Sequence, residues 1–178
     1  MNILMITGSP HKEGTSAKLA KEFEKGTKKN GHKVRIIQAA FEDLHPCKAC
    51  DYCIGHGGVC IQKDAMVGIQ KEIFEADMVV IVTPLYYFGM SAQIKMVLDR
   101  FYAFNDRLMS TQKKSVLLAA CGDEEEWVAN ALELHFKTVC QYLNWKIEGM
   151  LIAKGVHTAE DIDRTDYLNE AKNLGASL

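Results

Sequence analysis

Short apolar runs alternate with amphipathic segments along this chain, and that alternation restricts the folds it can adopt. Residues 2–6 form a strand-sized apolar run, and after a loop at 7–15 the apolar residues follow helical spacing as far as about Asn30. Asn30-Gly31 ends this helix, and residues 33–38 follow as a second strand. Strand, helix and strand in this order predict the first βαβ unit of a parallel sheet.

The same alternation continues to the end of the chain. Further strands are predicted at 77–83, 115–121 and 146–152, and helices at 64–76, 91–101, 124–143 and 163–174. Five strands alternating with five helices predict a flavodoxin-like three-layer α/β sandwich, in which helices cover both faces of a parallel sheet of order 2-1-3-4-5. We expect residues 1–178 to form one domain, because this length is sufficient to bury one full core.

Charge and hydropathy exclude two classes of partner. The chain carries 21 basic and 23 acidic residues, and no dense run of Lys and Arg could track a phosphate backbone, so we expect no nucleic acid. The longest apolar runs, 78–83 and 116–121, are too short to span a bilayer. Residues 1–6 lead directly into a Gly turn with no signal peptide, so a cytoplasmic location is expected.

The loop after the first strand has the properties of a phosphate site. Ligands of such sheets bind beyond the carboxyl ends of the strands where the strand order reverses, and the loops expected there are 7–15, 83–90 and 121–126. In the first loop, the hydroxyl groups of Ser9, Thr15 and Ser16 can donate hydrogen bonds beside a helix N-terminus, and His11 can flank the phosphate. The loop lacks both Gly-Lys-Ser/Thr and Gly-x-Gly-x-x-Gly, so a monophosphate such as that of FMN fits better; an ordinary capped turn is the alternative.

Three consecutive aromatic residues occupy the loop after the third predicted strand. Tyr86, Tyr87 and Phe88 stand where surface loops rarely expose large apolar side chains. A planar isoalloxazine ring would explain them, although packing into the core or into a dimer interface is an alternative. In the loop after the fourth strand, Gly122 would let the backbone approach the same ring.

Four of the six cysteines lie in the non-periodic segment 41–63. They follow the pattern Cys47-x2-Cys50-x2-Cys53-x6-Cys60, whose spacing lets three thiolates of one turn reach three irons of a [4Fe–4S] cluster while a fourth closes the site. Free thiols and a structural zinc, with His56 as a further ligand, are the alternatives. Cys121 and Cys140 stand in apolar runs and are expected to be buried thiols.

Together these residues resemble a known family. Gly8-Ser-Pro10 with Gly14-Thr-Ser16, the cysteine cluster, Pro84-Leu-Tyr86, and Ser91-Ala-Gln-Ile-Lys95 with Asp99-Arg100 are similar to the NAD(P)H-dependent FMN reductase family, and most similar to its iron–sulfur flavoprotein branch. The similarity runs in matching order from residue 1 to about 122. It implies an FMN phosphate at Ser9, Thr15 and Ser16 and a homodimer or homotetramer. It also implies an isoalloxazine held by Pro84, Leu85, Tyr86, Tyr87 and Phe88.

The expected function is electron transfer through FMN. NAD(P)H or another reductant would supply electrons, and a quinone, a nitro compound, free flavin or the iron–sulfur centre would accept them. Hydride transfer is the chemistry of the cofactor itself, so no catalytic residue is assigned. A non-enzymatic FMN carrier between protein partners and a flavin-free binding module are the alternative functions.

Overall fold

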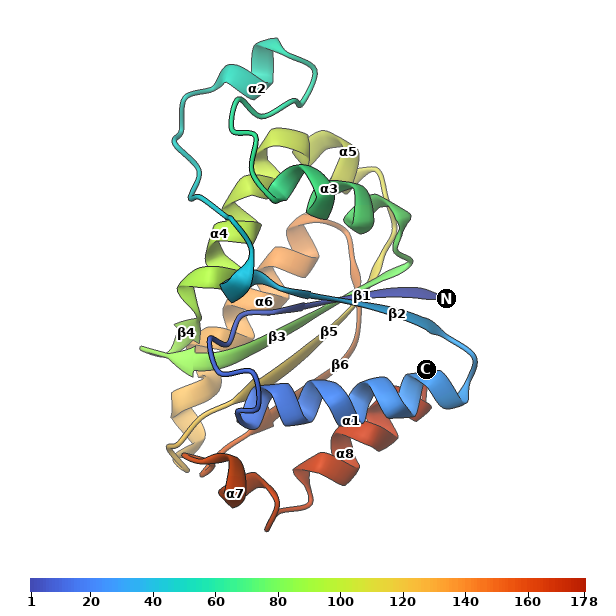
Figure 1. The fold of residues 1–178 in the computed structure, drawn as a ribbon, viewed down its shortest axis with the longest axis vertical. Coiled ribbons are helices and arrows are strands. Elements are labelled where there is room, and N and C mark those ends of the chain that lie inside the picture. The colour runs from blue at the N-terminus through green and yellow to red at the C-terminus, as the bar shows by residue number, and fades with distance from the viewer.

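In the computed structural model, which describes residues 1–178, five parallel strands form the centre of the molecule (Figure 1). Their order is β2-β1-β3-β5-β6, and every pairing between them is parallel. The order 2-1-3-4-5 predicted from the sequence is therefore confirmed. The strands are β1 (Asn2–Thr7), β2 (Lys33–Gln38), β3 (Met78–Tyr86), β5 (Lys114–Ala120) and β6 (Lys146–Ala153).

A sixth, short strand was not expected. β4 (Gly89–Met90) pairs antiparallel with the end of β3, which continues to Tyr86 instead of stopping at residue 83. Tyr87 and Phe88 form the two-residue turn between them with φ of 45° and 64°. Tight hairpins of this kind require positive φ at both turn positions, which bulky aromatic residues rarely adopt. Neither residue type predicts the turn, so the sequence indicated only an irregular loop.

Helices cover both faces of the sheet, as the sandwich prediction requires (Figure 1). On one face lie α1 (Thr15–Lys29), α7 (Ala159–Ile162) and α8 (Tyr167–Ala176). On the other lie α3 (Met66–Glu75), α4 (Ala92–Arg100), α5 (Asn105–Met109) and α6 (Asn130–Tyr142). The short α2 (Tyr52–Gly55) belongs to residues 46–63, which contain the four clustered cysteines and are called the cysteine segment below. This segment projects beyond α3 and α5 (Figure 1). None of the helices combines the length and the apolar character needed to cross a membrane.

Several helix boundaries differ from those predicted. The helix predicted at 163–174 corresponds to α8, which begins later, at Tyr167, and ends at Ala176. The separate short helix α7 precedes it, because Thr158 and Asp161 form a capping box there. The helix predicted at 124–143 begins as a 3₁₀ turn, Glu126–Ala129, before α6. Two further 3₁₀ turns, Ala39–Phe41 and Phe101–Phe104, follow β2 and α4.

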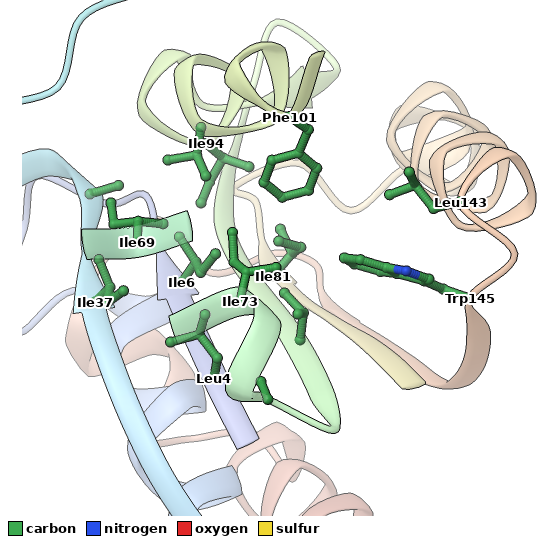
Figure 2. Packing of buried hydrophobic residues seen from close by; sticks show 14 of the residues in the cluster. Leu4, Ile6, Ile37, Ile69, Ile73, Ile81, Ile94, Phe101, Leu143 and Trp145 are labelled. Atoms are coloured by element: carbon green, nitrogen blue, oxygen red, sulfur yellow. The ribbon is translucent and has the colours of Figure 1, made fainter. Parts of the chain in front are cut away.

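Two apolar layers hold the sandwich together, because both faces of the sheet are covered. Alternate residues of β1 point to opposite faces: Leu4 and Ile6 join one layer, and Ile3 and Met5 join the other. Figure 2 shows the first layer, where Phe101 and Trp145 pack with isoleucines from the sheet and from α3 and α4.

The second layer includes an unusually close contact between α1 and α8. A Cβ atom added to Gly175 would lie 2.3 Å from the carbonyl oxygen of Phe23, and one added to Gly26 would lie 2.0 Å from that of Lys172. Real Cβ atoms do not approach backbone this closely, so the two glycines permit the helix backbones to touch. Ala171 is buried beside this contact.

We predict that Gly175→Ala destabilises the protein by about 1–3 kcal/mol, because α8 must move away from α1 to admit the methyl group. Gly68→Ala is the matched control, since Gly68 lies in α3 and a Cβ there would meet nothing within 4 Å. It should stabilise the fold by about 0.5–1 kcal/mol through helix propensity. Urea denaturation of both variants measures the difference, and equal midpoints would contradict the close-contact interpretation.

Candidate functional site

The main cleft lies where the loops after β1, β5 and β6 meet the end of β3, at the carboxyl edge of the sheet, and has a volume of about 880 Å³. Ligand pockets in proteins have volumes of about 300–1,000 Å³, so this cleft is large enough for a cofactor. The residues predicted to bind a cofactor that line this cleft are Ser9, His11, Thr15, Ser16, Pro84, Leu85, Tyr86 and Gly122.

One end of the cleft is the start of α1. Gly14 precedes the helix and supplies no side-chain cap, and the first turn contains no acidic residue. Ser16 is 1% exposed and its buried hydroxyl has no hydrogen-bond partner, whereas the Ser9 Oγ accepts the His11 N–H at 3.1 Å. Uncapped amides and an unpartnered buried hydroxyl at a helix N-terminus favour an anion. The residues present therefore fit the phosphate of FMN.

Buried hydroxyl groups connect this loop to the neighbouring elements. The Ser91 hydroxyl donates to the Gly8 carbonyl at 3.0 Å and accepts the Ile94 N–H at the start of α4. The Ser91 N–H in turn donates to Thr83 Oγ1 at 2.9 Å. The Gly8 N–H donates to Val82 at 2.8 Å, and a side chain at Gly8 would collide with Ser91. These bonds fix the first loop against the end of β3.

The other end of the cleft is lined by Pro84, Leu85 and Tyr86, with Tyr86 46% exposed. Tyr87 and Phe88 do not line it. Tyr87 is fully exposed at the tip of the hairpin, and the Phe88 ring packs against Trp127 with 5.2 Å between ring centroids. The structure therefore brings three of the five residues expected along the ring to the cleft.

A further loop, which follows β6, also lines the cleft, and the sequence did not predict it. Val156 donates its N–H to the Cys121 carbonyl at 2.9 Å, which holds this loop beside the loop after β5. The next residue, His157, covers Gly122 so closely that a Cβ there would lie 2.3 Å from the imidazole. The sequence signal is weak, because β6 is an edge strand and is separated by β5 from the pair where the strand order reverses.

The two remaining cysteines are buried, as predicted. Burial raises the pKa of the Cys140 thiol to about 11. Burial also raises the pKa of Cys121, which lines the cleft beside Gly122. Both thiols are therefore neutral near pH 7.

The cysteine segment forms a second, separate feature. Cys47, Cys50, Cys53 and Cys60 form no disulfide, and all four line one small cavity of about 20 Å³, together with Arg100. They are not gathered into a ready-made site, because no group of three or more His, Cys, Asp and Glu side chains stands close enough to hold a metal ion. The donor set nevertheless fits an iron–sulfur cluster, for which four thiolates are the usual ligands.

His56, the further ligand considered for zinc, does not line that cavity. Its ring stacks on Tyr52 with 3.6 Å between centroids, and its Nδ1 lies 2.7 Å from the Tyr52 carbonyl oxygen. These contacts occupy one ring nitrogen and orient the imidazole at the end of α2.

Comparison with known sequences agrees with this arrangement. The family model for NADPH-dependent FMN reductases matches residues 1–147. An iron–sulfur flavoprotein of Archaeoglobus fulgidus is 29% identical over 182 residues, which covers 100% of this chain and 79% of the relative. An iron–sulfur flavoprotein of Methanocaldococcus jannaschii is 35% identical over 100 residues, covering 56% of this chain and 51% of the relative. The chain thus spans about half the length of the second relative.

Solved structures share the fold. An NAD(P)H:quinone oxidoreductase from Methanothermobacter marburgensis superposes with a TM-score of 0.76 at 17% identity, covering 99% of this chain and 95% of the other. An FMN-dependent NADH-azoreductase from Bacillus anthracis, solved with FMN, gives 0.74 at 15% identity and covers 99% of both chains. The fold, the cleft and the match over residues 1–147 lead to one conclusion: this chain belongs to the NADPH-dependent FMN reductase family of flavin-dependent oxidoreductases.

Proposed function

We propose that this protein uses FMN to carry electrons from NAD(P)H to a small acceptor such as a quinone, a nitro compound or free flavin. One observation carries the proposal: the uncapped start of α1 and the Pro84–Tyr86 segment line the same cleft. The first suits a phosphate and the second suits a flat ring, and FMN contains both.

At the phosphate end, the chain would act through fixed dipoles. The first-turn amides of α1 and the Ser16 hydroxyl would donate to the phosphate oxygens, with Ser9, His11 and Thr15 around them. Binding of this kind requires no charged side chain. It depends instead on a helix start that is already formed.

At the ring end, Pro84, Leu85 and Tyr86 would contact the flavin, and Gly122 would let the backbone approach it. His157, which lies over Gly122, would border the same part of the ring. Bound FMN supplies the hydride and electron chemistry, and these residues would orient the ring and restrict access of water to it. Tyr87 and Phe88 form the hairpin tip and would lie outside the flavin site.

We also propose a homodimer or homotetramer. The side chains that support it surround the hairpin: Tyr87 is fully exposed, and Trp127, which packs against Phe88, is 57% exposed. Exposed aromatic groups of this size are typical of interfaces between subunits.

Ser16→Ala should weaken FMN binding about tenfold to a hundredfold, because it removes a buried hydrogen bond to a charged group. Riboflavin, which lacks the phosphate, should bind both proteins equally. Quenching of flavin fluorescence measures both affinities.

Ser177→Ala is the matched control, since the Ser177 hydroxyl bonds only to the Leu174 carbonyl at the end of α8. It should leave both affinities unchanged. If Ser16→Ala weakened riboflavin as much as FMN, Ser16 would not be a phosphate ligand.

For the cysteine segment we propose a [4Fe–4S] cluster ligated by Cys47, Cys50, Cys53 and Cys60. Convergence of all four thiols on one cavity supports it, as does the similarity to the two iron–sulfur flavoproteins. Ligation would require the segment to close around the cluster, since the thiols are not yet gathered. The cluster would exchange single electrons with FMN.

Cys50→Ala should reduce iron and acid-labile sulfide to background in anaerobically purified protein, while the FMN content stays at the wild-type level. Cys140→Ala removes a buried thiol far from the segment in the sequence and should retain iron. Wild-type protein that contains flavin but no iron would show that the four cysteines are free thiols. In the same samples, bleaching of the flavin bands by NAD(P)H distinguishes an enzyme from an electron carrier.

A further inference from the structure

Arg100, the last residue of α4, is a buried cation that the flavin cleft does not use. It is 2% exposed and is the largest fully buried side chain of the protein. Its Nη1 donates to Asp64 Oδ2 at 2.6 Å and its Nη2 donates to Asp64 Oδ1 at 3.0 Å, which makes a bidentate pair. Burial alone raises the pKa of Asp64, but bonds from Arg100 and from the His45 and Met66 amides outweigh it and lower this pKa, so the pair is ionised.

The pair closes the base of the cysteine segment. Arg100 Nη1 also donates to the His45 carbonyl at 2.9 Å, and the His45 N–H donates to Asp64 Oδ2 at 3.1 Å. His45 and Asp64 flank residues 46–63, which contain all four clustered cysteines. A single side chain from α4 therefore holds both ends of this segment together.

The segment itself is folded against the same region. Ala49 and Asp51 have φ of 49° and 53°, a left-handed conformation that turns the chain around Cys50. Gly58 packs so closely that a Cβ would lie 2.9 Å from the Ala103 carbonyl oxygen, just beyond α4. Such a backbone persists only where its surroundings fix it, and the Arg100 contacts lie at its base.

One donor of Arg100 remains without a partner. Its Nε is buried and forms no hydrogen bond, although its side chain lines the cavity together with the four cysteines. Leaving a charged donor unpaired in the interior is unfavourable, and a thiolate or a sulfide of an anionic cluster is a suitable acceptor. The cavity thus combines four sulfur ligands with one unused N–H of a buried cation.

We propose that Arg100 is a positioning residue of the cysteine site: it locks the ends of residues 46–63 through Asp64 and His45, and its Nε donates a hydrogen bond to sulfur when the site is loaded. This inference rests on the proposed [4Fe–4S] cluster for the sulfur contact. The lock itself is independent of the cluster.

Two variants separate these roles. Arg100→Gln removes the charge, the fork and the lock, whereas Arg100→Lys keeps a charge but cannot make the bidentate pair. Asp99→Asn is the matched control, because Asp99 is the preceding residue of α4 and its carboxylate pairs with Lys95 on the surface. Retention of FMN shows that each variant is folded; should Arg100→Gln fail to fold, Arg100→Lys carries the same test.

The first measurement is limited trypsin digestion of the iron-free protein, scored at Lys48 within the segment. We expect both Arg100 variants to be cleaved about tenfold faster or more, since cleavage follows the population of the opened segment, and Asp99→Asn to match the wild type. Cleavage of both variants at the wild-type rate would overturn the lock.

The second measurement is a redox titration of anaerobically purified protein, with iron and sulfide assays. Arg100→Gln should hold less iron or show a lower cluster potential, because a hydrogen bond to sulfur and a nearby positive charge both favour the reduced cluster. Full iron content with an unchanged potential would overturn the sulfur contact. Wild-type protein without iron would instead refute the proposed cluster and, with it, that contact, while the trypsin result still decides the lock.

Discussion

Parallel pairing of β1 with β3 is the constraint on which the site depends. The register places Thr7 opposite Val82, so both strands deliver their following loops to the same edge of the sheet. Ser91 then bonds the first loop to the start of α4, and Thr83 bonds Ser91. The start of α1 is consequently held in position with its first-turn amides uncapped and the Ser16 hydroxyl unpartnered. In the proposed function, a phosphate group would accept hydrogen bonds from these donors.

Helix α4 connects the two chemical features of the molecule. The residue before it, Ser91, fixes the loop at the flavin cleft, and its last residue, Arg100, holds the cysteine segment. A helix of nine residues is about 13 Å long. The same rigid element thus positions the proposed phosphate loop at one end and the proposed cluster loop at the other, which gives the two sites a fixed relationship in one chain.

The sequence predicted those parts of the structure that depend on local periodicity. Strands of a sheet that is covered on both faces are continuous apolar runs, so these runs and the helical spacing between them were sufficient to predict the five strands. The alternation of strands and helices then predicted their order and the loops at the carboxyl edge. The cleft residues Ser9 to Ser16 followed from the position of their loop in the fold. His157 did not, since its place over Gly122 depends on contacts between two loops that lie far apart in the sequence.

Two other features could not be derived from local pattern. The hairpin at Tyr87 and Phe88 adopts positive φ against the preference of both residues. Asp64 accepts the Met66 N–H at the start of α3, but its pairing with Arg100, the last residue of α4, joins positions 36 residues apart in the sequence. Such long-range pairs leave no periodic signal in a single sequence.

A crystal structure of the protein with FMN tests the central claim most directly. We predict phosphate density against the first turn of α1, within hydrogen-bond distance of Ser16, and ring density along Pro84–Tyr86. Flavin bound elsewhere, or a phosphate that does not contact the start of α1, would contradict the account.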